Sequence, residues 1–315
     1  MMQKFAMLFP GQGSQKSGML AELAAQHPEV ESTFAEASEV LGQGLWDIVQ
    51  HDTEGQLLNQ THITQPVLLT ASVAIWRLWQ ARQAPLPAVL AGHSLGEYSA
   101  LVCGGVLGFQ DAVGLVSQRG RYMQAAVPAG EGAMAAVMGL EPQQVSAICA
   151  STTTKEESEV VSVSSFNSPE QTVIAGTAAA VAQAITQCKE AGAKRAVPLP
   201  VSVPSHCALM TPAASQLAQE LDKVEFAEPQ IPIIQNVTGT STEHSATIKE
   251  NLIKQLYLPV LWSDSVKMIY QSGIRLAVEC GPGRVLCGLA KRTEAELLCH
   301  SSDTPAELDN AIAAA

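Results

Sequence analysis

Residues 88–98 read Ala-Val-Leu-Ala-Gly-His-Ser-Leu-Gly-Glu-Tyr, and this stretch decides the fold. The apolar run 88–91 is typical of a buried strand, and a helical pattern begins at Glu97. The sequence 92–96 between them matches G-x-S-x-G, a tight strand-to-helix turn that exposes a serine hydroxyl. Glycines are needed because larger side chains would clash in that turn. The stretch therefore predicts a nucleophile elbow at Ser94; the simpler alternative is a glycine-rich turn with an incidental serine.

Short apolar runs alternate with helical patterns on both sides of this stretch. The runs 5–9 and 274–279 are strand candidates, and strands that alternate with helices are typical of a mostly parallel sheet. Residues 130–200 have a different order, β-α-β-β-α-β, which is the ferredoxin-like arrangement. We therefore expect the α/β class. A large α/β-hydrolase-like catalytic domain would be formed by residues 1–129 and 201–315, and a small ferredoxin-like α+β subdomain, residues 130–200, would be inserted in it.

The charge balance argues against a nucleic-acid partner. The chain of 315 residues has 18 Lys and Arg against 30 Asp and Glu, which gives a formal net charge of −12. Proteins that bind nucleic acid rely on Lys and Arg to neutralise phosphates. Only 15% of the residues are charged and 47% are hydrophobic, so a chain of this length can bury a large core. We expect a folded protein that does not bind nucleic acid.

The targeting and cysteine patterns favour the cytoplasm. The apolar run 5–10 passes directly into polar, glycine-rich sequence instead of the long apolar region of a signal peptide. No stretch has the ~20 apolar residues that cross a bilayer. The seven cysteines are scattered without a C-x-x-C pair, so neither a zinc site nor a disulfide framework is expected, and free thiols suit a reducing compartment. We expect a cytoplasmic protein with no membrane span, no metal and no cofactor.

A serine nucleophile requires a base, and His206 is the candidate among the seven histidines. It follows a strand-like run, 201–203, that breaks at a proline just before a helical pattern. A histidine at such a junction can reach the sheet edge that carries Ser94; a purely structural histidine is the alternative. Asp222 and Asp264 are acidic candidates to orient the ring, and a backbone carbonyl could do so instead.

Arg119 falls on the apolar face of a helix expected over 111–126. At about 100° per residue, it lies in an apolar stripe, while Arg121 points to the opposite, solvated side. The stripe consists of Ala112, Leu115, Val116 and Met123. A buried guanidinium is costly unless it meets an anion, and its planar fork suits a carboxylate. Arg119 therefore indicates either a clamp for a substrate carboxylate or a structural pair with an Asp or Glu.

Five short motifs stand in an order and spacing that resemble a known enzyme family. They are 9–15 (Phe-Pro-Gly-Gln-Gly-Ser-Gln), 92–98 (Gly-His-Ser-Leu-Gly-Glu-Tyr), 118–120 (Gln-Arg-Gly), 204–206 (Pro-Ser-His) and 279–283 (Glu-Cys-Gly-Pro-Gly). The first motif alone fails as a dinucleotide-binding G-x-G-x-x-G sequence, because Lys16 stands where the last glycine is needed. Together the motifs resemble the malonyl-CoA:acyl carrier protein transacylases of the stand-alone bacterial fatty-acid synthesis type, over residues 5–292.

This resemblance implies a role for each candidate residue. Ser94 would attack the thioester of malonyl-CoA while His206 takes its proton. The backbone N–H groups of Gln12 and Leu95 would bind the oxyanion. Arg119 would hold the free carboxylate of the malonyl group. The acyl group would then pass from the serine to the phosphopantetheine thiol of acyl carrier protein, with ping-pong kinetics.

The resemblance also bears on the orientation of the base and on partners. The backbone carbonyl of Gln255 would orient His206. The partners would be acyl carrier protein and malonyl-CoA or CoA, and the chain is expected to be a monomer. Because the carrier is itself acidic and CoA carries phosphates, basic side chains around Ser94 are expected to recognise them. The candidates are Lys189, Lys194, Arg195, Arg284, Lys291 and Arg292.

Two alternative functions stay open at the level of sequence. A serine esterase or thioesterase uses the same elbow, and it differs from a transferase in admitting water, which the sequence does not reveal. A non-catalytic module that binds a carrier protein is the other alternative. Arg119 favours a reaction on an acyl group that bears an acid.

Overall fold

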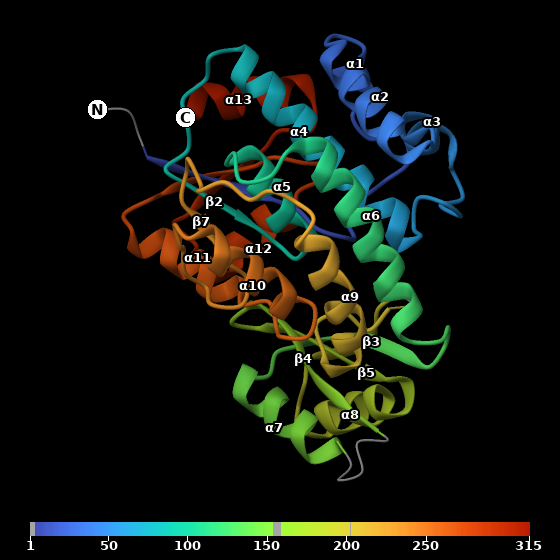
Figure 1. The fold of residues 1–315 in the computed structure, drawn as a ribbon. Coiled ribbons are helices and arrows are strands. Elements are labelled where there is room, and N and C mark those ends of the chain that lie inside the picture. Colours follow the sequence, from blue (N-terminus) through green and yellow to red (C-terminus); the bar gives the residue numbers. More distant parts are fainter. Residues whose placement is uncertain (1–3, 154–158, 202) are drawn as a thin grey trace.

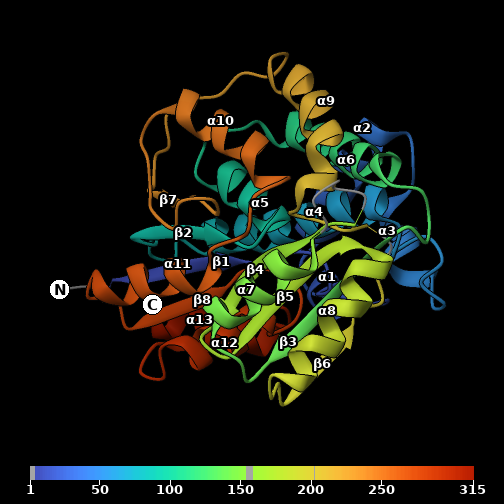
Figure 2. The ribbon, with the colours of Figure 1, turned by 90° about the horizontal axis from the view of Figure 1, so that it is seen from below.

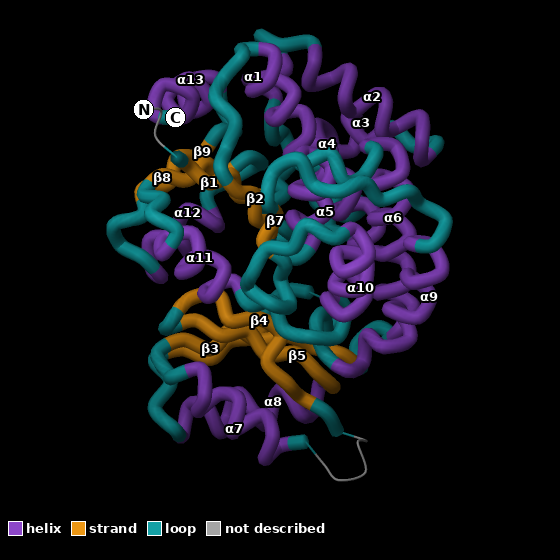
Figure 3. The backbone as a smooth tube through the Cα atoms, turned by 60° about the vertical axis from the view of Figure 1, so that its left-hand side comes forward, coloured by secondary structure: helices purple, strands orange, loops and turns teal. Residues whose placement is uncertain are grey.

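Two separate sheets, each with helices packed against it, form the molecule (Figure 1). The computed structural model describes residues 4–153, 159–201 and 203–315. Figure 3 shows the larger, parallel sheet in the upper part of the view and the second sheet below it. The two sheets correspond to the two kinds of order that the sequence predicts.

The larger sheet has five parallel strands in the order β7-β2-β1-β8-β9. The strands are β1 Phe5–Phe9, β2 Val89–Gly92, β7 Ile233–Ile234, β8 Leu276–Glu279 and β9 Leu298–Ser301. Every residue of β1, β2 and β8 is buried, as expected for central strands that are covered on both faces. The predicted α/β class with a parallel sheet is confirmed.

Helices cover both faces of the parallel sheet. Along β1, Phe5, Met7 and Phe9 enter one hydrophobic core, while Ala6 and Leu8 enter the other, because successive side chains of a strand alternate between faces. The helices of this part are α1 Ala21–Ala24, α2 Glu29–Leu41, α3 Leu45–His51, α4 Thr61–Ala81, α5 Leu95–Cys103, α6 Phe109–Ala126, α9 Thr211–Leu221, α10 Ser245–Gln255, α11 Trp262–Gln271, α12 Val285–Thr293 and α13 Pro305–Ala314. The first core includes α2, α4, α5, α6 and α9, and the second includes α11 and α12.

The second sheet is antiparallel, with the strand order β4-β5-β3-β6. Its elements are β3 Gly132–Met138, α7 Pro142–Thr152, β4 Val161–Ser168, β5 Gln171–Thr177, α8 Ala178–Glu190 and β6 Arg195–Pro198. Seen from below, α7 and α8 lie on the outer side of this sheet (Figure 2). The β-α-β-β-α-β order of the ferredoxin-like subdomain is therefore confirmed, while the exact domain boundaries at 129/130 and 200/201 stay a prediction.

The small sheet is tied to the large part next to the elbow. In β4, the N–H of Phe166 donates to the carbonyl of Val260 at 2.9 Å, and the N–H of Val260 donates to the carbonyl of Ser164 at 2.9 Å. His93, which follows β2, has its Nε2 2.8 Å from Oδ1 of Asn167 in β4. These contacts place β4 beside the end of β2, where Ser94 lies.

The structure corrects the expectation that all thiols are free. Cys287 in α12 and Cys299 in β9 form a disulfide. The other five cysteines are free and buried, as is common for small, weakly polar side chains. The bridge was not foreseen because the two residues belong to no recognisable cysteine motif. In the residues that the structure describes, we find no helix with the length and apolar character that crossing a bilayer requires.

Candidate active site

The turn between β2 and α5 has the strained geometry of a nucleophile elbow. Ser94 precedes α5 with φ 52° and ψ −107°, a conformation that residues other than glycine rarely adopt. A Cβ atom on Gly92 would lie 1.9 Å from the carbonyl carbon of Gly96, and a Cβ atom on Gly96 would lie 1.9 Å from the carbonyl oxygen of Phe9. Both glycines are therefore required. The turn is not a loose glycine-rich loop but one that holds Ser94 against the end of the sheet.

His206 contacts Ser94 directly. Its Nε2 lies 2.7 Å from Oγ of Ser94, and its Nδ1 lies 2.6 Å from the backbone carbonyl of Gln255. A carbonyl only accepts, so Nδ1 carries the proton and Nε2 is left to accept from the serine hydroxyl. Asp222 and Asp264 do not orient the ring; they face Lys249 and Lys267 at the surface. The carbonyl of Gln255 occupies that place instead.

The environment of His206 keeps its imidazole neutral. Burial and, after it, the nearby charge of Arg119 lower the pKa of His206 to about 3, against the opposing effect of the hydrogen bond to Gln255. The side chain is only 5% exposed. At neutral pH the ring is therefore in the form that can accept a proton from Ser94.

Arg119 reaches the same serine from α6. Its guanidinium is buried, and its Nη2 lies 3.3 Å from Oγ of Ser94. Nη1 donates to Oε1 of Gln65 at 2.8 Å and Nη2 donates to Oε1 of Gln255 at 2.9 Å. Across residues 4–153, 159–201 and 203–315, no Asp or Glu forms a salt bridge with Arg119. Its hydrogen-bond partners are neutral, so the charge can still bind an anion brought by a ligand.

Two side chains that sequence reasoning missed hold the elbow in place. Oδ1 of Asn236 accepts from the N–H of Ser94 at 2.7 Å, and its Nδ2 donates to the carbonyl of Gly92 at 2.6 Å. Oε2 of Glu97 accepts from the N–H of Asn236 at 3.1 Å and from Nε2 of Gln255 at 2.7 Å. Glu97 has one local signal in the sequence, because it is a charged residue directly after the G-x-S-x-G turn, at the start of a buried helix.

The loop after β1 packs against the elbow. A Cβ atom on Gly11 would lie 2.4 Å from the carbonyl oxygen of His93, so the backbone of this loop touches that of the turn. Within the described part of the chain, neither the N–H of Gln12 nor that of Leu95 is taken by a protein acceptor. Leu95 also begins α5, whose N-terminus favours negative charge. The role of Gln12 and Leu95 as oxyanion donors stays a prediction that this packing supports.

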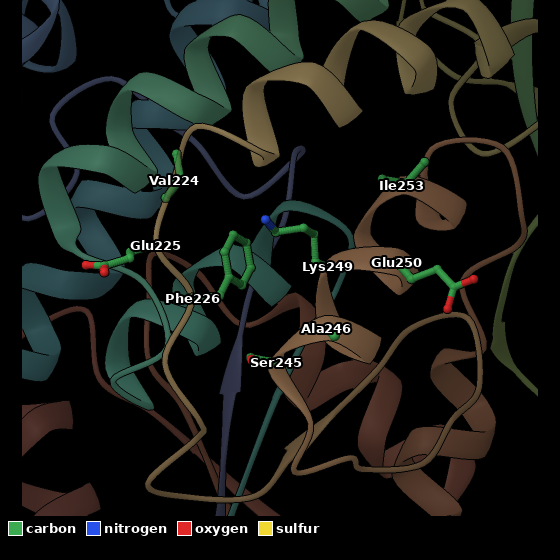
Figure 4. Close-up of a pocket in the computed structure, with 8 residues that line it drawn as sticks. All are labelled: Val224, Glu225, Phe226, Ser245, Ala246, Lys249, Glu250 and Ile253. Atoms are coloured by element: carbon green, nitrogen blue, oxygen red, sulfur yellow. The ribbon is translucent and has the colours of Figure 1, made fainter.

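A hollow of about 460 Å³ lies away from this group, between α10 and the chain that follows α9 (Figure 4). It is lined by Val224, Glu225, Phe226, Ser245, Ala246, Lys249, Glu250 and Ile253. Lys249 lies 5.2 Å from the ring centroid of Phe226, and Figure 4 shows Glu225 and Glu250 directed outwards. None of the lining residues belongs to the group around Ser94, so the hollow is separate from the candidate active site.

Comparison with known proteins agrees with this geometry. A sequence model described as "Acyl transferase domain" matches residues 6–306. The malonyl CoA-acyl carrier protein transacylase of Salmonella typhimurium is 52% identical over 311 residues, which cover 99% of both chains. A crystal structure of an acyl carrier protein S-malonyltransferase from Vibrio cholerae is 56% identical, with a TM-score of 0.94 over 98% of this chain and 99% of that one.

A further solved structure shows a relative with a bound protein. It contains a malonyl-transacylase in complex with its type II PKS acyl-carrier protein; it is 50% identical, with a TM-score of 0.96 over 99% of each chain. Identity at this level over the whole length goes beyond a shared fold. The chain belongs to the malonyl CoA-acyl carrier protein transacylases, a family of the acyl transferase domain.

Proposed function

We propose that this chain transfers a malonyl group from coenzyme A to the phosphopantetheine thiol of acyl carrier protein, in fatty acid biosynthesis. The observation that carries the proposal is the position of one oxygen atom. Oγ of Ser94 lies 2.7 Å from the imidazole of His206 and 3.3 Å from the buried guanidinium of Arg119. A nucleophile, its base and a site for a carboxylate therefore meet within one small volume.

The first half of the reaction loads the serine. His206 accepts the proton of Ser94 at Nε2 as Oγ attacks the thioester carbonyl of malonyl-CoA. The N–H groups of Gln12 and Leu95 would stabilise the oxyanion; one such donor typically contributes about 10²–10³ in rate. When the intermediate collapses, His206 returns the proton to the sulfur of CoA, which leaves as the thiol. The product is a malonyl ester on Ser94.

Arg119 selects the acyl group. The malonyl carboxylate is separated from the reacting carbonyl by one methylene, so it lies close to any group that contacts Oγ of Ser94. Nη2 of Arg119 is such a group. Guanidinium–carboxylate hydrogen bonds are charge-assisted and therefore about twice as strong as neutral ones. Gln65 and Gln255, which bind the two terminal nitrogens, fix the plane of the guanidinium.

The second half of the reaction unloads the serine in the same way. His206 takes the proton of the phosphopantetheine thiol, the sulfur attacks the ester on Ser94, and the proton returns to Oγ. These steps use side chains and backbone groups of the protein alone, so we propose that no cofactor takes part. The relatives described above are transacylases, so they do not favour the esterase or thioesterase alternative.

We propose that the carrier protein docks on basic side chains of the small subdomain and of α12. Lys189 lies in the last turn of α8, and Lys291 and Arg292 lie in the last turn of α12. Two other candidates have acidic partners in the structure: Lys194 faces Glu170, and Arg284 pairs with Glu307. We propose that the exposed members recognise the acidic carrier and the phosphates of CoA. We also propose that the chain acts as a monomer, since one chain carries all groups of the site, and that it works in the cytoplasm.

Intact-mass measurement tests the function. We expect malonyl-CoA to give a lasting malonyl adduct on the wild-type protein, which disappears in Ser94→Ala and when holo acyl carrier protein is added. Transfer of the adduct to the carrier would distinguish the enzyme from a non-catalytic binding module. Rapid loss of the thioester without a carrier would instead show a hydrolase and refute the proposal.

A further inference from the structure

Glu97 is a buried carboxyl group for which the reaction described above has no use. It lies in the first turn of α5 and is 1% exposed. Both of its hydrogen bonds fall on one oxygen, Oε2, which accepts from Gln255 and Asn236. In the described part of the molecule, Oε1 has no hydrogen-bond partner. A charged carboxylate in such a place is costly unless an opposite charge lies nearby.

The opposite charge is Arg119, and a single amide separates the two groups. The side chain of Gln255 donates from Nε2 to Glu97 and accepts at Oε1 from Nη2 of Arg119. Arg119 is itself buried, and its Nε has no hydrogen-bond partner in the described residues. Its hydrogen-bond partners, Gln65, Gln255 and Ser94, are neutral. In the free protein, Glu97 is therefore the acidic group placed to offset the charge of the buried guanidinium.

A substrate carboxylate on Arg119 changes this balance. Two negative charges would then share one buried positive charge, and like charges in a common site disfavour ionisation of one of them. We propose that Glu97 is the resting counter-charge of Arg119 and takes up one proton from solvent when a carboxylate-bearing acyl group binds. The inference rests on the proposed function, because it assumes that the malonyl carboxylate binds at Arg119.

Proton uptake of this kind is additional to the proton movements of acyl transfer. In the loading step the proton of Ser94 passes through His206 to the sulfur of CoA, so the net count is zero. An acetyl group follows the same route and releases the same thiol. It has no carboxylate, and it should therefore cause no uptake. The difference between malonyl and acetyl groups isolates the contribution of Glu97.

The groups around Glu97 set the pH at which the uptake appears. Burial raises the pKa of Glu97 to about 7, against the hydrogen bonds from Gln255 and Asn236 and the charge of Arg119. Above pH 7 the free protein therefore holds the carboxylate, and the substrate charge raises its pKa further. We expect uptake of about 0.1 proton per acyl group at pH 6, rising towards about 0.9 at pH 8.

Three other titratable groups face the same volume and could respond in its place. Tyr98 lies next to Glu97 on α5, and burial raises its pKa to about 12, so it stays protonated throughout this range. His93 lies in the elbow and His206 on the far side of Ser94; burial lowers the pKa of both rings. Either histidine could take the proton instead, and a variant of Glu97 separates these possibilities.

The test combines a pH-indicator dye in weakly buffered solution with intact-mass measurement of the same samples. Wild-type protein is mixed with malonyl-CoA or acetyl-CoA at pH 6, 7 and 8, and proton uptake is expressed per acyl group attached. Glu97→Gln keeps the size of the side chain and removes its charge, and it should abolish the uptake. Glu279→Gln is the matched control: burial also raises the pKa of Glu279 to about 7, but it faces α12, where it accepts from Leu286 and Cys287.

The outcomes separate this inference from the proposed function. Absence of a malonyl adduct would contradict the function itself. A full adduct at pH 8 without uptake, or uptake that survives in Glu97→Gln, would overturn the assignment to Glu97 and leave the function standing. Loss of the uptake in Glu97→Gln but not in Glu279→Gln supports the assignment. If Glu97→Gln does not fold, the rise of uptake from pH 6 to pH 8 in the wild type, with malonyl but not acetyl groups, decides the question.

Discussion

Replacing Arg119 by Ala should change which acyl group the protein transfers more than how fast it transfers in general. The guanidinium lies 3.3 Å from Oγ of Ser94 and meets only neutral hydrogen-bond acceptors. Without it, the malonyl carboxylate would enter a buried site that lacks an opposite charge and contains Glu97. Both effects disfavour malonyl binding, and neither acts on an acetyl group.

The size of the effect follows from the burial of the site. Removing one partner of a buried ion pair costs about 3–5 kcal/mol. Since 1.36 kcal/mol corresponds to a factor of ten in rate, kcat/KM for malonyl-CoA should fall about 10²–10⁴-fold. The variant also leaves Oε1 of Gln65 and Oε1 of Gln255 without the donor that Arg119 supplies, a structural cost that both substrates share. We expect kcat/KM for acetyl-CoA to change less than tenfold.

The assay compares initial rates of transfer from malonyl-CoA and from acetyl-CoA to holo acyl carrier protein. Arg121→Ala is the matched control, because Arg121 is exposed on the opposite side of α6; it should leave the malonyl-to-acetyl ratio unchanged. Thermal unfolding of both variants checks that they are folded. An equal loss with both acyl groups in Arg119→Ala would refute the carboxylate clamp.

Three further results are expected. Because burial lowers the pKa of His206 to about 3, the imidazole stays neutral down to low pH. The pH profile of kcat/KM for malonyl transfer should therefore show no fall on the acid side near pH 6.5, and such a fall would mean that the ring titrates normally. Asn236→Ala removes the side chain that bonds the N–H of Ser94 and the carbonyl of Gly92. At about 1–3 kcal/mol for each group, the free energy of unfolding measured in urea should fall by about 2–6 kcal/mol, and a change below ~0.5 kcal/mol would contradict the bracing role of Asn236. In the folded protein the pKa of Glu279 is raised from 4.5 to about 7, chiefly by burial. The stability that this group contributes is therefore fully present below pH 4.5 and is lost as the pH rises through 7. Glu279→Gln should flatten the decline of the unfolding temperature between pH 5 and pH 8, and an unchanged decline would exclude Glu279 as its source.

Much of the site could be predicted from sequence because its signals are local. The G-x-S-x-G turn specifies its own strand and helix, and the period of α6 alone places Arg119 on the buried face. The structure bears out both placements. The carbonyl of Gln255 was named only through the family resemblance, since a backbone acceptor carries no sequence signal. The roles of these residues in the reaction stay predictions that the experiments above test.

The rest depends on packing between distant segments. Gln65 contacts Arg119 across 54 positions, and Asn236 contacts Ser94 across 142, so no local pattern could indicate either pair. β7 has only two residues, Ile233–Ile234, which is too short for a period-2 signal. The bridge between Cys287 and Cys299 likewise joins α12 to β9 without a motif.

The contact between the backbone of the β1 loop and the elbow has a consequence for how such enzymes diversify. β1 and β2 are adjacent strands, with Phe9 opposite Gly92, and glycines let the turns that follow them touch. The backbone that carries Ser94 and the expected oxyanion donors is thus positioned by contacts between main-chain atoms of two neighbouring turns, with the side chain of Asn236 as a brace. Arg119 and Gln65 project instead from α6 and α4 as ordinary side chains. Descendants of one ancestral protein could therefore acquire new acyl substrates through substitutions on these two helices, while the backbone around the nucleophile Ser94 stays the same.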